Sequence, residues 1–164
     1  MFNSIIKILP ILLLSFVLSC AGSSSGEKPG DYSYTATIGP VTAYDYQDKT
    51  RLSLNKYQYQ IERNEDYGNR KYLETMWKYR TPFEDERQLG VVRAKTRIIL
   101  HVTPRMRSVA GRTLHRVQFI GENLVQFMGV ELWQTAPLTD MCKEYFKRWA
   151  NELKTEFSTS IRRY

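Results

Sequence analysis

Residues 91–103 read VVRAKTRIILHVT, and their alternation says more about the fold than any other stretch of the chain. Every second residue from Val92 to Val102 is apolar, apart from Thr96. The positions between them carry Arg93, Lys95, Arg97, Ile99 and His101. A period of two places the two sets on opposite faces of a strand. The sequence therefore predicts a half-buried β-strand over 91–103, and we expect it to end at Pro104.

Shorter stretches on both sides alternate in the same way. We expect further strands over 32–38, 52–63, 71–80, 112–120 and 124–133. The first of these is predicted to be an edge strand that ends at Gly39-Pro40.

Two turns should connect these strands. The polar segment 64–69 contains Gly68, which favours a hairpin of 52–63 with 71–80. Gly121-Glu122-Asn123 should join the last two strands. Within 71–80, one face is expected to carry Leu73, Thr75, Trp77 and Tyr79.

Two helices are also expected. Thr81-Pro82-Phe83-Glu84 has the form of a capping box, and Gly90 can close the segment, so residues 82–89 should form a short helix. Thr139 is a suitable N-cap for a longer C-terminal helix. The apolar residues of that helix recur at helical spacing, namely Cys142, Tyr145, Phe146, Trp149, Leu153 and Phe157.

Together these elements predict an α+β fold. It would be an antiparallel sheet of four to six strands with a long C-terminal amphipathic helix packed on one face. The chain has 164 residues, of which 42% are hydrophobic and 25% charged, as is usual for a globular protein. We find no internal repeat, so a single globular domain is expected over 32–164.

The N-terminal segment MFNSIIKILPILLLSFVLSC differs in character from the rest of the chain. Lys7 precedes an apolar run of about 12 residues, whereas a membrane span needs about 20. This arrangement predicts a signal peptide over residues 1–19. The run ends in Val17-Leu18-Ser19-Cys20, which resembles the lipobox of bacterial lipoproteins.

Resemblance to the lipoprotein family implies cleavage before Cys20 and acylation of that cysteine, which would be the lipidation site. Ala21 follows it, which by the family's sorting rule implies the outer membrane, facing the periplasm. Residues 20–31 would then be the lipidated cysteine and a flexible tether, since 21–26 read AGSSSG. A disulfide between Cys20 and Cys142 is the alternative use of these two thiols.

The chain is basic, and export restricts the partners that this charge can meet. Removing residues 1–19 takes away only Lys7, leaving 23 basic against 17 acidic residues, a net charge of +6. We expect no nucleic-acid partner, but an envelope protein or an anionic envelope polymer. The candidate surface for an anionic partner consists of Arg93, Lys95, Arg97, Arg105 and Arg107. The alternative is a solvated sheet face on which these cations meet cross-strand carboxylates.

Residues suited to catalysis are few. His101 and His115 would lie opposite each other in a hairpin centred near Ser108, at a distance that could hold a metal, but no third ligand is evident. Cys142 falls in the first turn of the last helix, where a thiol can be activated or simply buried. We find none of the common hydrolase, P-loop or zinc-protease motifs.

The tyrosines are concentrated in the first half of the chain, where nine of the eleven lie between Tyr32 and Tyr79. Such rings suit a binding surface or the packing of strands, and the sequence leaves both open.

From these observations we expect a non-catalytic, membrane-anchored binding or assembly module with no cofactor or metal. Its layout is similar to that of the accessory lipoproteins of outer-membrane assembly machines. Two alternatives stay open. One is an envelope hydrolase or metal-dependent enzyme that uses His101, His115 or Cys142. The other is a structural spacer between membrane and cell wall.

Overall fold

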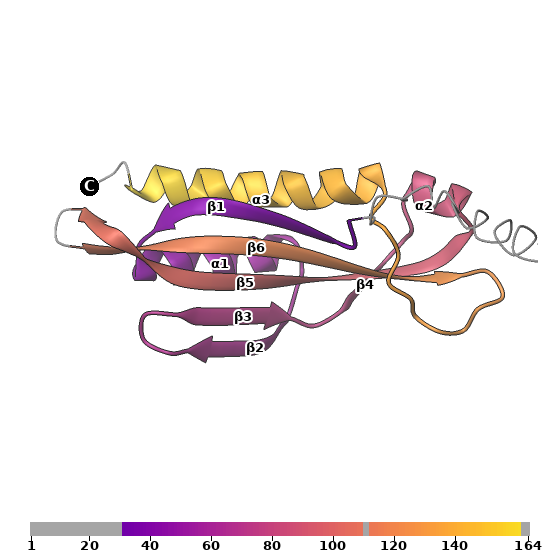
Figure 1. The fold of residues 1–164 in the computed structure, drawn as a ribbon, viewed down its shortest axis with the longest axis horizontal. Coiled ribbons are helices and arrows are strands. Elements are labelled where there is room, and N and C mark those ends of the chain that lie inside the picture. Colours follow the sequence, from indigo (N-terminus) through magenta and orange to yellow (C-terminus); the bar gives the residue numbers. More distant parts are fainter. Residues whose placement is uncertain (1–30, 110–111, 162–164) are drawn as a thin grey trace, which may run out of the picture.

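One long antiparallel hairpin forms the centre of the computed structural model, which describes residues 31–109 and 112–161 (Figure 1). Its strands are β5 (Val91–Val109) and β6 (Arg112–Phe127). The sheet continues in the order β1-β6-β5-β3-β2, with β4 beside β5, and all its pairs are antiparallel. The remaining strands are β1 (Ser33–Val41), β2 (Ile61–Asp66), β3 (Lys71–Thr75) and β4 (Lys78–Arg80).

Three helices complete the fold, which is the α+β arrangement that the sequence predicts. They are α1 (Ala43–Lys56), α2 (Glu84–Gln88) and α3 (Asp140–Ile161). The long helix α3 runs along the sheet beside β1, and α1 lies behind the strands in the view of Figure 1. Both α1 and α3 contribute to one hydrophobic core on a single face of the sheet.

Alternation in β5 and helical spacing in α3 produce that core. Ile98, Leu100 and Val102 are at most 2% exposed in this core, as the period of two predicts, and Ala94 is buried in a smaller cluster with Val91 and Val125. The expectation for Val92 was wrong: it is 45% exposed, because the register shifts between Val91 and Arg93. The α3 stripe is equally buried and consists of Cys142, Phe146, Trp149, Leu153 and Phe157. Thr139 caps α3 as expected, because its Oγ1 accepts a hydrogen bond from Cys142 N at 3.4 Å.

The prediction of a strand over 52–63 was wrong, because α1 occupies residues 43–56. Thr42 begins this helix, its Oγ1 accepting from Asp45 N at 3.2 Å. The buried side chains Tyr46, Thr50 and Leu54 recur every four residues and form the buried face of α1. The alternating residues Tyr57, Tyr59 and Ile61 follow the end of α1 at Lys56. The strand predicted from them therefore began too close to the N-terminus.

The hairpin around Gly68 exists, but it joins β2 to β3. Residues 71–80 are divided into β3 and β4, which pair with different parts of β5. This break changes the face: Leu73 lies opposite Leu100 on the core side, whereas Tyr79 lies opposite Lys95 on the other side. The expected shared face of Leu73, Thr75, Trp77 and Tyr79 was therefore wrong.

Several element ends also differ from expectation. β5 continues past Pro104, because the register shifts between Pro104 and Ser108, where a proline is tolerated. β6 runs unbroken through Gly121-Glu122-Asn123 instead of turning there, and its pairing with β5 ends at Phe127. The short helix α2 begins at Glu84, with Phe83 as N-cap and the Glu86 carboxylate accepting from Phe83 N.

Candidate functional site

The sheet has a second face, opposite the core, on which no helix of the described residues packs. We call it the open face. Cross-strand partners point to the same side of a sheet, so the register assigns its members. Among the pairs on this face are Arg97 with Glu122, Tyr72 with His101, and Tyr79 with Lys95.

Lys95 is enclosed by aromatic rings on the open face. Its Nζ lies 4.4 Å from the ring centroid of Trp133, 5.4 Å from that of Trp77 and 6.0 Å from that of Tyr79. Tyr79 and Trp133 also contact each other edge to face at 5.7 Å. We call these three rings the aromatic cluster. An ammonium over indole and phenol faces is held by cation–π attraction, which orders both the lysine and the rings.

Arg97 lies next to Lys95 and already has acidic partners. Its Nε donates to Glu122 at 2.6 Å, its Nη1 is paired with Glu74, and its guanidinium lies 4.6 Å from the Trp77 centroid. Burial alone would lower the pKa of Arg97, but hydrogen bonds and charge from both glutamates raise it. For Arg97, the structure thus agrees with the alternative hypothesis, in which the cations of this strand pair with carboxylates of neighbouring strands.

Tyr72 extends this network toward the edge of the sheet. Its hydroxyl donates to Glu74 at 2.7 Å, and the guanidinium of Arg63 lies 5.0 Å from its ring centroid. Burial, and then the hydrogen bond to Glu74, raise the pKa of Tyr72 to about 12. The tyrosines in the first half of the chain are therefore divided between core and surface, because Tyr46 and Tyr59 are buried while Tyr79 is 66% exposed.

The five predicted anion-binding residues do not form one continuous row. Arg93, Lys95 and Arg97 share the open face, as their spacing predicts. Arg105 lies farther along β5, where it lines a hollow of about 400 Å³ with Arg116. The side chain of Arg107 lies outside the described residues.

The three residues of the enzyme hypothesis are not brought together. The expected pairing of His101 with His115 was wrong, because the strand pairing still includes Val109 and Arg112, so the turn lies beyond Ser108. His101 faces Gln118 on the open face, whereas His115 faces Pro104 and is buried on the core side. The described residues contain no group of three His, Cys, Asp or Glu side chains that could hold a metal.

Cys142 lies near the other end of β5 and is fully buried. Its Sγ is 3.7 Å from Nη2 of Arg80, which pairs with Ala94. From Ala94 to Pro104 a strand advances by about 33 Å, so Cys142 and His115 occupy distant regions. Burial raises the pKa of the Cys142 thiol to about 12, which does not suit a nucleophile.

No family model matches the chain, and no curated protein resembles it significantly. None of the helices in the described part of the chain is both long and apolar enough to cross a membrane. Cys20 lies outside the described residues.

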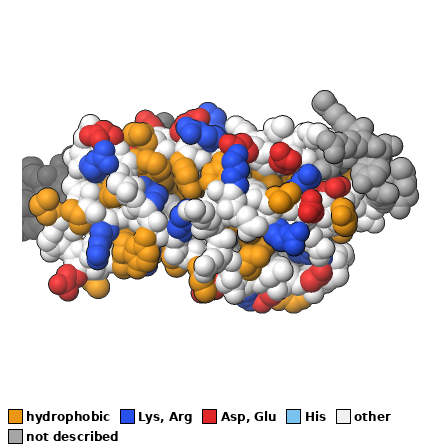
Figure 2. All heavy atoms as spheres, turned by 180° about the vertical axis from the view of Figure 1, so that it is seen from behind, with side chains coloured by type: hydrophobic (Ala, Val, Ile, Leu, Met, Phe, Trp, Pro, Cys, Tyr) orange, Lys and Arg blue, Asp and Glu red, His pale blue; other side chains and the backbone are white. Residues whose placement is uncertain are grey.

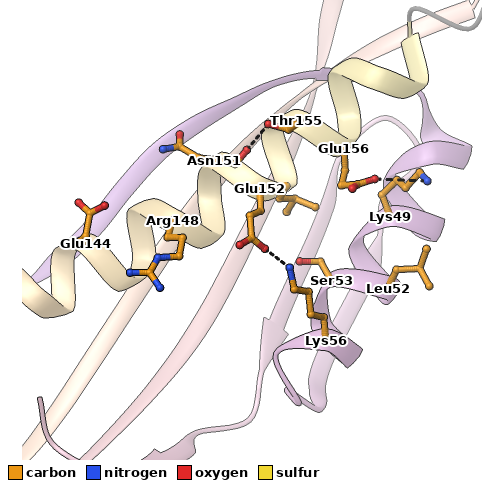
Figure 3. Close-up of a pocket in the computed structure, with 11 residues that line it drawn as sticks. Lys49, Leu52, Ser53, Lys56, Glu144, Arg148, Asn151, Glu152, Thr155 and Glu156 are labelled. Atoms are coloured by element: carbon orange, nitrogen blue, oxygen red, sulfur yellow. Dashed lines mark hydrogen bonds and ion pairs between the residues drawn. The ribbon is translucent and has the colours of Figure 1, made fainter.

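A groove of about 540 Å³ lies between α1 and α3 (Figure 3). Its charges are largely paired, since Lys56 contacts Glu152 at 2.6 Å and Lys49 contacts Glu156 at 3.8 Å. On the side opposite to that of Figure 1, basic and acidic side chains alternate with hydrophobic ones (Figure 2). Because the charges of the groove between α1 and α3 pair with each other, we place the candidate site on the open face, at the aromatic cluster.

Sequence reasoning selected Arg93, Lys95 and Arg97 but missed Trp77 and Trp133 as members of the same surface. Trp77 was expected on the face of Leu73, because the prediction treated residues 71–80 as one unbroken strand. Trp133 was placed in a strand, whereas it belongs to the loop that follows β6. The composition offered one usable signal, because tryptophan is rare and two of the three tryptophans lie outside the C-terminal helix.

Proposed function

We propose that this protein is a lipid-anchored envelope lipoprotein, held by acylated Cys20, which binds another envelope protein through the open face. The observation that carries the proposal is the aromatic cluster around Lys95, with Arg97 beside it. We assign it no catalytic role, no metal and no cofactor.

The chemistry of the open face favours a protein over a polyanion at this position. Tyr, Trp and Arg are the side chains that contribute most to protein interfaces. Arg97 is already neutralised by Glu74 and Glu122, and Lys95 is held against three rings. A polyanion would need cationic side chains that have no acidic partner. A protein can instead pack on rings and paired charges whose positions are already fixed before binding.

Crosslinking at two matched tyrosines tests this proposal. Tyr79 on the open face is 66% exposed, and Tyr44 on α1 is 75% exposed. A photo-crosslinking amino acid placed at either position in the full chain should be equally accessible. We expect one defined protein adduct in the native envelope from position 79, and none from position 44.

Substitution gives the second arm of the test. Tyr79→Ala should weaken capture of the crosslinked partner by about tenfold, which corresponds to about 1.4 kcal/mol, while Tyr44→Ala should leave it unchanged. Identical adducts from both positions, or none from either, would contradict binding through the open face and favour the spacer hypothesis.

A second candidate, binding of an anionic envelope polymer, is favoured at a different place. Arg105 and Arg116 line the 400 Å³ hollow at the end of β1, and neither has an ion-pair partner among the described residues. Arginine binds phosphate and carboxylate in bidentate fashion. If this candidate holds, Arg105→Gln with Arg116→Gln should abolish salt-sensitive retention of purified lipopolysaccharide, whereas Tyr79→Ala should not.

A further inference from the structure

Exposed aliphatic side chains gather at one end of the molecule. Of the nine exposed Leu, Ile, Val and Met side chains in the described residues, six come from the segments flanking α2 and β6 and from the start of α3. They form what we call the apolar tip: Leu89, Val92, Met128, Val130, Leu132 and Met141. Met128 and Leu132 are the most exposed of them, at 77% and 74%.

Strand pairing and hydrogen bonds join the segments that carry these side chains. Val91 pairs with Phe127, and Met128 N donates to Gly90 O at 3.0 Å, so the loops before β5 and after β6 lie side by side. Met141 N donates to Asp85 at 2.9 Å, which ties the start of α3 to α2. Both loops lie at the right-hand end of Figure 1.

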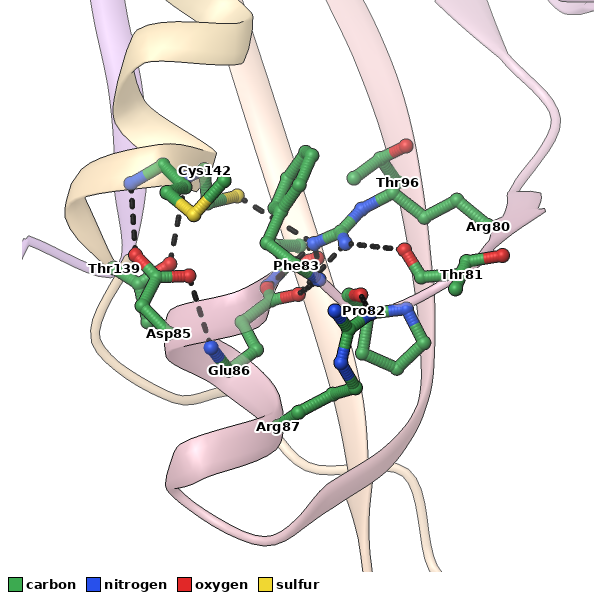
Figure 4. Close-up of polar contacts among 12 residues, drawn as sticks. Arg80, Thr81, Pro82, Phe83, Asp85, Glu86, Arg87, Thr96, Thr139 and Cys142 are labelled. Carbon is green, nitrogen blue, oxygen red and sulfur yellow. Dashed lines mark hydrogen bonds and ion pairs between the residues drawn. The ribbon is translucent and has the colours of Figure 1, made fainter.

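A buried polar network lies at this end of the molecule (Figure 4). Glu86, which is 1% exposed, accepts two hydrogen bonds from Arg80, at 2.5 and 2.7 Å, and one from Asn123 at 3.1 Å. The network therefore links α2 to β4 and β6. Monomeric proteins seldom expose several large aliphatic side chains together.

The tether enters the fold at the same end. Asp31 O accepts from Leu138 N at 2.9 Å, and the Asp31 carboxylate is 3.3 Å from Lys143 Nζ. Asp31 lies eleven positions after Cys20. A random coil of that length has a mean end-to-end distance of about 17–20 Å, and its fully extended limit is about 40 Å. Acyl chains on Cys20 would thus hold the apolar tip close to the bilayer.

We infer that the apolar tip inserts into the surface of the bilayer that holds the acyl chains of Cys20. The inference rests on the anchoring in the proposed function and adds an orientation to it. Aliphatic side chains lose contact with water there, which favours their insertion. Arg93 borders Val92, has no ion-pair partner among the described residues, and can approach lipid phosphates.

With the apolar tip in the bilayer, the long axis of the sheet would stand at a steep angle to the plane of the membrane. β5 spans 19 residues, so the distal end of the hairpin would stand about 60 Å from the tip. The open face would then lie sideways to the membrane, accessible to a neighbouring envelope protein.

Depth-dependent quenching tests the inference on the full-length acylated protein. A fluorophore is attached to Leu132→Cys, or to Leu52→Cys as the control, in vesicles of phosphatidylethanolamine and phosphatidylglycerol. Leu52 is 52% exposed but lies on α1, away from the tip. Native Cys142 is buried and Cys20 would be acylated, so labelling is selective. We expect spin-labelled lipid to quench position 132 at least twofold more than position 52.

The outcomes separate this inference from the proposed function. Protein that floats with vesicles but shows equal quenching at both positions overturns the insertion of the tip and leaves the anchor intact. Protein that does not float overturns both. Self-quenching at position 132 without lipid quenching assigns the tip to a second copy of the chain, which also overturns the inference. Met128→Cys repeats the measurement should the first label disturb folding.

Discussion

The ring of Phe146 in α3 lies against the bare Cα of Gly121 in β6. A methyl group at Gly121 would overlap three carbon atoms of that ring. Phe146 is fully buried, with the rings of Tyr34 and Tyr145 against it. The glycine therefore sets how closely the C-terminal helix approaches the sheet.

Gly121→Ala should consequently destabilise the fold by about 1–3 kcal/mol through overpacking. Urea denaturation followed by circular dichroism would measure the change. The double variant with Phe146→Leu provides the control, because a smaller side chain makes room for the methyl group and should recover part of the loss. An unchanged midpoint for Gly121→Ala would show that α3 can shift freely.

Gly121 also shows where sequence reasoning reached its limit. Gly121-Glu122-Asn123 has turn composition, so a turn was the local expectation. The decisive contact comes from Phe146, which is distant in the chain. A glycine in such a sequence can mark either a close approach within a strand or a turn between two strands, and the local sequence does not distinguish the two.

The ion pair between Arg80 and Glu86 yields a second prediction. The two side chains are only 11% and 2% exposed, and removing the carboxylate charge leaves the guanidinium without its counter-charge. Glu86→Gln should therefore lower the free energy of unfolding by about 3–5 kcal/mol. Glu84→Gln, on the same helix but paired with Arg87 in solvent, should cost less than about 0.5 kcal/mol. Equal effects of the two variants in chemical denaturation would contradict the structural role of Glu86.

The fold was predictable where one strong pattern dominates an element. β5 alternates almost without interruption, and α3 carries a continuous apolar stripe, so both were expected close to their observed positions. The helix α1 was missed because Tyr46, Thr50 and Leu54 form a narrow buried face that polar residues interrupt. Tyrosines at positions 57 and 59 then suggested strand alternation, although they follow the helix.

The thiol of Cys142 gives a third prediction, which also tests the anchor. Burial holds its pKa at about 12, so it should not react with a disulfide reagent at pH 8 in the folded protein. After unfolding in guanidinium, purified protein should release one thiol equivalent. Two equivalents would mean that Cys20 is unmodified, and none would indicate a disulfide between the cysteines.

The candidate site was predictable only in part, for a reason that lies in its construction. The cations Lys95 and Arg97 follow from one strand. Their partners come from elsewhere: Glu122 from β6, Glu74 from β3 and Trp133 from a loop. Such convergence depends on strand register and loop path, and one-residue differences in register reverse the face of every side chain.

The buried imidazole of His115 yields the last prediction, on pH. Burial is the main cause that lowers its pKa below the ordinary value of about 6.5. The unfolded chain therefore takes up a proton in a range where the folded protein does not, so stability should fall as pH decreases from 7.5 to 5.5. His115→Gln should flatten this dependence in urea titrations. His101→Gln, exposed on the open face, should keep it. A slope that survives in His115→Gln would assign the pH dependence to other groups.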